Sequence, residues 1–159
     1  MLEPQPTTSL PTAVDPSAAS APLDQAAAVD ATAAGGKLIL VADDETHILN
    51  VVSLKLRNAG YRVLTASDGQ EALDLARQQR PDLLITDYHM PLLSGLELCQ
   101  RLKQDPQTQG IPAIMLTARG YHLDEQDTKT SGIRLMLSKP FSPRHLLLTV
   151  NEVITGRAA

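Results

Sequence analysis

The sequence predicts an open α/β fold, in which helices cover a parallel β-sheet. From Lys37 onward, short apolar runs alternate with longer segments of helical periodicity, a pattern typical of βα repeats. Four of the short runs end in polar side chains, and parallel strands place their carboxyl ends at one ligand-binding edge of the sheet. These runs are LILVADDE (38–45), LLITDYHMP (83–91), IMLTA (114–118) and LMLSKPF (135–141).

The composition divides the chain into a tail and one domain. Residues 1–36 hold ten alanines and five prolines but no aromatic residue, so they offer too little apolar surface to offset the entropy cost of ordering. We expect a disordered, Ala/Pro-rich tail over 1–36 and a folded domain over 37–159. A solvated extension fits this composition better than a segment that docks on the domain.

The first half of the domain is predicted to hold two strands and two helices in alternation. The strands span 38–42 and 61–66, and the first helix spans about 46–58. Its apolar positions are Ile48, Val51, Val52, Leu54 and Leu56. Ser67 and Gln70 have the spacing of a capping box for the second helix. That helix is expected to bury Ala72, Leu73 and Ala76.

The second half is predicted to hold three strands and three helices. The strands are expected over 82–86, 113–117 and 135–138. Ser94 can cap a helix over 95–104, and Pro143 can open the last helix. The last helix is expected to bury Leu146, Leu147, Val150 and Ile154. The remaining helix, over 121–131, lies between the strands 113–117 and 135–138. It has few large apolar residues and should be the least stable helix.

Three aspartates follow predicted strands directly: Asp43 and Asp44 follow the first, and Asp87 follows the third. An isolated Asp-Asp pair usually caps a helix, but a third carboxylate at a neighbouring strand end changes the interpretation. Carboxylates that lie close together raise one another's pKa and repel. Mg²⁺ prefers oxygen ligands and would remove that cost. The sequence therefore predicts a magnesium site at this edge.

Thr117 and Lys139 end two further strands and are expected at the same edge. Elsewhere such a threonine often caps a helix, and a Lys-Pro pair often forms a surface turn. Here three carboxylates, one hydroxyl and one ammonium together describe a Mg²⁺-assisted phosphoryl acceptor. Asp87 is the expected nucleophile, because carboxylates accept groups in such transfers and a metal draws charge from the transferring oxygens.

The order and types of these residues resemble the receiver domain of two-component response regulators, from about Lys37 to Thr155. The run DYHMPLLSGLEL matches the receiver phosphoacceptor loop, with Pro91 and Gly95 in the expected places. The resemblance implies a flavodoxin-like, doubly wound sheet of five parallel strands in the order 2-1-3-4-5, flanked by five helices.

The resemblance also implies roles for the site residues. Asp44, Asp87 and the backbone carbonyl of His89 would bind Mg²⁺ directly, and Asp43 would act through a bound water. Thr117 would donate to a phosphoryl oxygen and Lys139 would reach the acceptor, with a cis bond before Pro140. The His89 side chain is not expected to bind a metal or to carry phosphate, because no partner histidine lies at ligand spacing and the side chain should point outward.

One position departs from the receiver pattern. Receivers usually carry Tyr or Phe three residues before the lysine, and this chain has Met136. Methionine is flexible and repacks readily, but it has no hydroxyl. The departure puts the usual aromatic readout in doubt, while the acceptor chemistry is unaffected.

The expected function is a phosphoacceptor switch rather than a dedicated enzyme. Asp87 would take phosphate from a histidine kinase or His-phosphotransfer protein, and a downstream protein would bind the face formed by 121–131, 135–138 and the last helix. The alternatives are a phosphorylation-independent scaffold and an aspartate-based phosphatase of the haloacid dehalogenase type. That phosphatase family places its nucleophile in a D-x-D pair on the first strand. Here the expected nucleophile is a lone aspartate, Asp87, which follows the third strand. The chain would be a single-domain regulator or a fragment of something larger.

Charge and composition limit the other classes of function. All 14 basic residues lie in 37–159 with 14 of the 18 acidic ones, so this stretch is formally neutral and gives no support for nucleic-acid binding. No apolar run is long enough for a transmembrane helix, and the N-terminus lacks the features of a signal peptide. Cys99, the single cysteine, should be a core residue. We expect a cytoplasmic protein without membrane contact.

Overall fold

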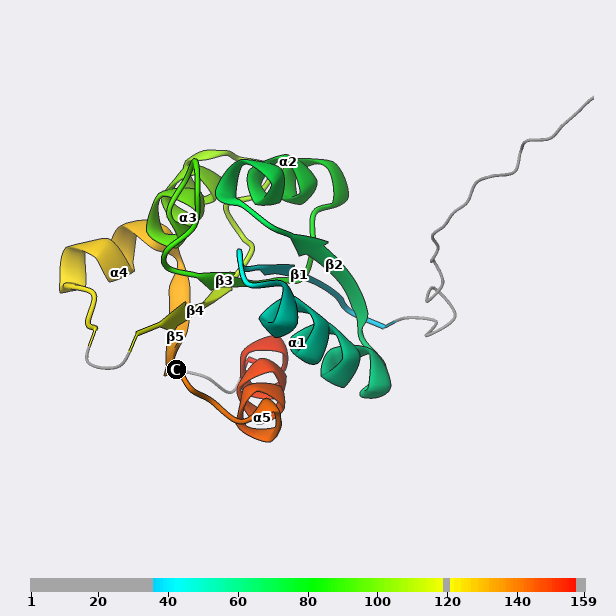
Figure 1. Ribbon diagram of the computed structural model, residues 1–159. Coiled ribbons are helices and arrows are strands. Elements are labelled where there is room, and N and C mark those ends of the chain that lie inside the picture. Colours follow the sequence, from blue (N-terminus) through cyan, green and yellow to red (C-terminus); the bar gives the residue numbers. More distant parts are fainter. Residues whose placement is uncertain (1–35, 119–120, 157–159) are drawn as a thin grey trace, which may run out of the picture. The chain divides into compact units, whose positions relative to one another are not determined.

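The computed structural model describes residues 36–118 and 121–156. The predicted tail over 1–36 lies outside the described residues, apart from Gly36. Within the described ranges, strands and helices alternate along the chain (Figure 1). They are β1 (Leu38–Ala42), α1 (Thr46–Asn58), β2 (Arg62–Ala66), α2 (Gly69–Gln79), β3 (Leu83–Asp87), α3 (Gly95–Gln104), β4 (Ala113–Thr117), α4 (Glu125–Ser131), β5 (Ile133–Ser138) and α5 (Pro143–Ile154).

The strands form one parallel sheet in the order β2-β1-β3-β4-β5, which confirms the predicted topology. Figure 1 shows α2 and α3 on one side of the sheet and α1 and α5 on the other. Every residue of β1, β3 and β4 is buried, as expected for central strands covered on both faces. Their carboxyl ends therefore lie at one edge, close together in space.

Successive strand residues point to opposite faces and build two separate cores. Leu40, Leu84 and Met115 pack in the cluster that contains the buried residues of α2 and α3. Ile39 and Ile85 pack in the cluster that contains those of α1 and α5. Cys99 is buried in the first cluster, and burial raises the pKa of its thiol to about 12, so it is a core residue as predicted.

Two helix starts were predicted from capping patterns, and one of those predictions is wrong. The side chain of Ser94 accepts from the backbone N–H of Glu97, which confirms the cap of α3. At α2 the cap is Asp68, whose carboxylate accepts from the backbone N–H of Glu71 at 2.7 Å, so the predicted pair of Ser67 and Gln70 is incorrect. An aspartate is an equally good cap, and it shifts the start of the helix by one residue.

The phase of α1 and the start of α4 also differ from the predictions. Val51 and Leu54 are 46% and 61% exposed, while Leu49 and Ser53 are buried in their place. On α5, Thr149 and Val153 are buried, whereas the predicted Leu147 and Ile154 are half-buried. The helix predicted over 121–131 begins only at Glu125, because Asp124 caps it by accepting from the backbone N–H of Asp127.

The strand boundaries are close to those predicted. β1 and β4 have the predicted bounds, while β2 and β3 begin one residue later and β5 begins two residues earlier than expected. None of the helices in the described part of the chain is long and apolar enough to span a bilayer.

Candidate functional site

The carboxyl edge of the sheet collects the side chains that the sequence singled out. Asp43 follows β1 directly, Asp87 is the last residue of β3, Thr117 is the last residue of β4 and Lys139 follows β5. The backbone N–H of Lys139 donates to the carbonyl of Thr117 at 2.7 Å, which continues the pairing of β4 with β5. The sheet topology thus positions residues that are up to 96 positions apart in the chain.

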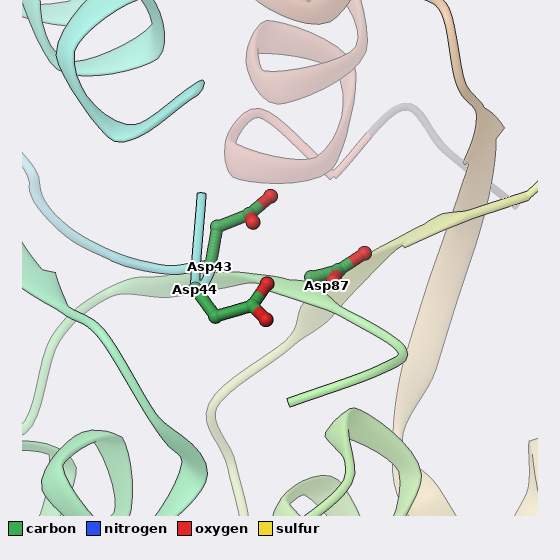
Figure 2. A group of neighbouring side chains, drawn as sticks. All are labelled: Asp43, Asp44 and Asp87. Carbon is green, nitrogen blue, oxygen red and sulfur yellow. The ribbon is translucent and has the colours of Figure 1, made fainter. Parts of the chain in front are cut away.

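The three aspartates form one cluster of oxygen atoms. One carboxylate oxygen from each of Asp43, Asp44 and Asp87 lies within 4.8 Å of the other two. Figure 2 shows Asp43 and Asp44 reaching from the end of β1 toward the region beside Asp87. Asp43 is fully buried and Asp87 is 7% exposed, whereas Asp44 is open to solvent. A donor set made of carboxylate oxygens suits a hard divalent cation such as Mg²⁺.

Lys139 supplies the positive charge of the site. Its Nζ lies 3.1 Å from Asp43 Oδ2, 3.0 Å from Asp87 Oδ1 and 3.1 Å from Glu45 Oε1. A lysine ammonium has three N–H donors, so each donor has a carboxylate acceptor. The peptide bond between Lys139 and Pro140 is cis, as the resemblance implied.

The electrostatics of the site reflect crowded, partly desolvated carboxylates. Burial raises the pKa of Asp43 and of Asp87; the charge of Asp87 adds to the rise at Asp43, and that of Asp44 adds to it at Asp87. Hydrogen bonds from Lys139 oppose both rises. Burial lowers the pKa of Lys139, but its bonds to Asp87, Glu45 and Asp43 outweigh this and raise it above the ordinary value. One ammonium therefore faces more negative charge than it neutralises.

An open cavity of about 750 Å³ gives access to the carboxylate of Asp87. Ile48 and Val51 of α1 line it together with Phe141 from the loop after β5, and Lys139 also contributes to its wall. The half-exposed Val51 is one of the apolar positions that the sequence indicated on α1. A molecule in solvent can therefore reach Asp87 through this cavity.

The loop after Asp87 is held in place by close backbone contacts. The backbone N–H of Gly95 donates to the carbonyl of Tyr88 at 2.8 Å, and a Cβ atom at Gly95 would collide with the carbonyl oxygen of Asp87. The side chain of His89 is exposed, as predicted, and its ring stands edge-on to Tyr88 with 4.8 Å between centroids.

The structure brings two further features to this region that the sequence analysis missed. Glu45 belongs to the ion-pair cluster around Lys139. Its position directly after Asp43 and Asp44 in the sequence could have indicated that it lies at the site. Tyr121 follows β4 in the chain, and the centroid of its ring lies 4.5 Å from the centroid of the Tyr88 ring. A hydrogen bond between these two side chains raises the pKa of Tyr121 to about 12, and no local pattern in the sequence signals this pairing.

Comparison with known proteins agrees with this geometry. Residues 39–151 match the model of the response regulator receiver domain. The phosphate regulon transcriptional regulatory protein PhoB of Pseudomonas aeruginosa is 41% identical over 123 residues, which are 75% of this chain and 52% of PhoB. The chemotaxis response regulator CheY4 of Vibrio cholerae superposes with a TM-score of 0.69 at 37% identity, covering 74% of this chain and 98% of CheY4.

A third similar protein was solved with a bound metal ion. The receiver domain of the sensor histidine kinase PA1611 from Pseudomonas aeruginosa PAO1, solved with a magnesium ion coordinated in its active site cleft, has a TM-score of 0.68 at 29% identity. That match covers 76% of this chain and 98% of the PA1611 receiver chain.

The protein described here is a member of the response regulator receiver domain family. Its fold and its acidic edge are those of a two-component signalling domain. The chain spans about half the length of PhoB and of the other transcriptional regulators that it matches, and nearly the whole length of CheY4.

Proposed function

We propose that this domain is a switch that accepts a phosphoryl group on Asp87. The observation that carries the proposal is the surroundings of that carboxylate. Asp87 ends β3, lies within 4.8 Å of the Asp43 and Asp44 oxygens and contacts Lys139 at 3.0 Å. It is also open to a solvent-accessible cavity. Carboxylates, an ammonium and an approach path are the elements that phosphoryl transfer to an aspartate requires.

The donor is a phosphohistidine on a histidine kinase or a His-phosphotransfer protein. A carboxylate oxygen of Asp87 forms a bond to phosphorus while the phosphorus–nitrogen bond of the donor breaks, and the imidazole nitrogen keeps that electron pair. Mg²⁺, when bound, neutralises charge on the transferring oxygens. Asp44, Asp87 and the backbone carbonyl of His89 would hold the ion directly, and Asp43 would act through a water.

Lys139 and Thr117 respond to the phosphoryl group by donating hydrogen bonds to its oxygens. Phosphorylation replaces one negative charge by about 1.5 to 2, so the net change in charge is small. A hydrogen bond to a charged group is worth about 1.5–3 kcal/mol, whereas moving an equilibrium from 1:99 to 99:1 takes about 5.5 kcal/mol. Thr117 alone therefore falls short of a complete switch, so either Lys139 and Mg²⁺ also favour the phosphorylated state or the switch is graded.

The output is a change in protein contacts rather than turnover of a substrate. We place the responsive face on α4, β5 and α5, where a downstream protein would bind. Met136 is half-buried on β5, at the position where the family usually has an aromatic residue. A cytoplasmic location fits this role, since the donors of two-component signalling act there.

Intact-mass spectrometry tests the proposal directly. Incubation with acetyl phosphate and Mg²⁺ should add one phosphoryl group to the wild-type protein and none to Asp87→Asn. Asp74→Asn is the matched control, because it removes the same charge from an exposed position on α2 and should be phosphorylated normally. Phosphorylation of Asp87→Asn would contradict the acceptor assignment, and an inert wild type would favour the scaffold alternative.

A further inference from the structure

Glu45 is a carboxylate of the site that the chemistry above does not use. It lies in the N-cap position of α1, yet its side chain makes no capping hydrogen bond. Instead its Oε1 atom accepts from Lys139 Nζ at 3.1 Å, while its backbone N–H donates to Asp43 Oδ1 at 2.9 Å. Glu45 is therefore fixed at both ends to residues of the acceptor site, and its side chain is directed at the lysine.

Glu45 differs from the other two partners of Lys139. Asp43 and Asp87 belong to the carboxylate cluster that suits a cation, and their side chains are 0% and 10% exposed. The Glu45 side chain lies outside that cluster and is 50% exposed. Of the three ion pairs, the one with Glu45 is the most accessible to water and hence the weakest.

Phosphorylation of Asp87 changes what Lys139 has to bind. The oxygen that joins phosphorus loses its anionic charge, and new anionic oxygens appear on the phosphoryl group. All three lysine donors already have carboxylate acceptors, so a phosphoryl oxygen gains a donor only if one acceptor is released. Of the three carboxylates, Glu45 can be released from Lys139 at the lowest cost in free energy, because water can solvate its half-exposed side chain.

We propose that Glu45 is a positioning residue that competes with the phosphoryl group for Lys139 and so weakens the response of this domain to phosphorylation. The proposal rests on the proposed function, since it assumes that Asp87 is the acceptor. Glu45 limits the affinity for the phosphoryl group without contacting the reacting atoms. An ion pair with a solvent-exposed partner changes an equilibrium constant by up to about fivefold, which sets the size of the effect.

The test compares wild type with Glu45→Gln, which keeps the shape of the side chain and removes its charge. The dissociation constant of beryllofluoride, a non-covalent phosphoryl analogue, is measured by fluorine NMR at saturating Mg²⁺. We expect binding to become about twofold to fivefold tighter, with a similar acceleration of phosphoryl gain from acetyl phosphate. Glu152→Gln removes an equal charge from an exposed position of α5 and should leave both quantities unchanged. Unchanged beryllofluoride affinity in Glu45→Gln would overturn the proposal.

Two further variants separate contact with Lys139 from a general effect of charge. Glu45→Asp keeps the charge but shortens the side chain by one methylene, so it should tighten binding much as Glu45→Gln does; wild-type affinity would contradict a contact mechanism. In a Lys139→Met background, Glu45→Gln should have no further effect, and a full effect there would also refute the proposal. Failure of the proposed function would look different, since wild type would then neither gain phosphate nor bind beryllofluoride.

Discussion

Lys139 contacts three carboxylates at once, and its single positive charge offsets only part of the negative charge of the site. Among the described residues it is the only basic side chain within ion-pair distance of Asp43 and Asp87. Burial raises the pKa of both aspartates despite the lysine; the charge of Asp87 adds to the rise at Asp43, and the charge of Asp44 adds to the rise at Asp87. This cluster of carboxylates is therefore a local source of instability until a cation or a proton compensates its charge.

This strain predicts a pH-dependent effect of Asp87→Asn on stability in the absence of divalent cations. The pKa of Asp87 is raised above its ordinary value of 3.8, so folding favours the protonated form. Below 3.8 the carboxyl is protonated in both states and the variant should match wild type. As the pH rises from 3.8 through the raised pKa, wild type should lose stability relative to the variant. Chemical denaturation across this range measures the difference, and equal stability at neutral pH would contradict it.

The same substitution should weaken Mg²⁺ binding, because it removes one of the three carboxylates of the cluster. Isothermal calorimetry of wild type and Asp87→Asn measures this directly, with Asp74→Asn as the control. If Asp87→Asn bound Mg²⁺ as tightly as wild type, the metal site would have to lie elsewhere.

A second residue-scale prediction concerns Ser53 on α1. Its hydroxyl is buried and has no hydrogen-bond partner among the residues that the structure describes. An unsatisfied buried polar group costs about 1–3 kcal/mol, and alanine also favours the helix, so Ser53→Ala should raise the free energy of unfolding by about 1 kcal/mol. Ser142→Ala is the opposite control, since Ser142 caps α5 and its loss should cost about 1 kcal/mol. Urea denaturation measures both, and a destabilised Ser53→Ala would show that the hydroxyl is satisfied.

At the scale of elements, α4 is the least anchored helix of the described fold. It has seven residues, of which only Ser131 is buried, and its ion pair between Lys129 and Glu125 is exposed. A hydrogen bond from Gln100 to Thr130 links it to α3. Few buried contacts make local opening inexpensive. Met136 and Leu123 pack nearby on the same core cluster, so this region contains adaptable side chains in place of a rigid aromatic ring.

We therefore predict that α4 is poorly protected from hydrogen exchange in the free protein and gains protection with beryllofluoride and Mg²⁺. Ordering costs about 1–2 kcal/mol per residue, so a modest phosphoryl signal should order only part of the helix. Thr117→Ala should abolish the gain while Asp87 still accepts phosphate, and Met136→Tyr should alter only the output face. Strong protection of α4 before phosphorylation would refute this account.

At the scale of the whole molecule, the sequence predicted the features that depend on long-range repetition. Apolar runs ended by Asp, Thr or Lys identified the strands and the residues at their carboxyl edge. It could not predict which of several adjacent polar residues caps a helix, as at Ser67 and Asp68. The exposure of Val51 and the contact of Glu45 with Lys139 were also missed, because tertiary packing decides helix phase and side-chain direction.

The composition of residues 1–36 gives a prediction for the whole chain. With ten alanines, five prolines and no aromatic residue, this segment is expected not to support the domain, so its deletion should change neither the melting temperature nor the rate of phosphorylation. Calorimetry and intact-mass kinetics of a chain beginning at Lys37 measure both quantities. A marked loss of either would show that the Ala-rich segment supports the domain.

The most direct measurement of the central claim is to locate the modified residue after phosphorylation. Borohydride reduces an aspartyl phosphate to homoserine, and peptide mass spectrometry then identifies the position. We predict homoserine at residue 87, and only when both acetyl phosphate and Mg²⁺ are present. Conversion at Asp43 or Asp44 instead, or a stable phosphate on another residue type with Asp87 unmodified, would contradict the assignment of Asp87 as the phosphoryl acceptor.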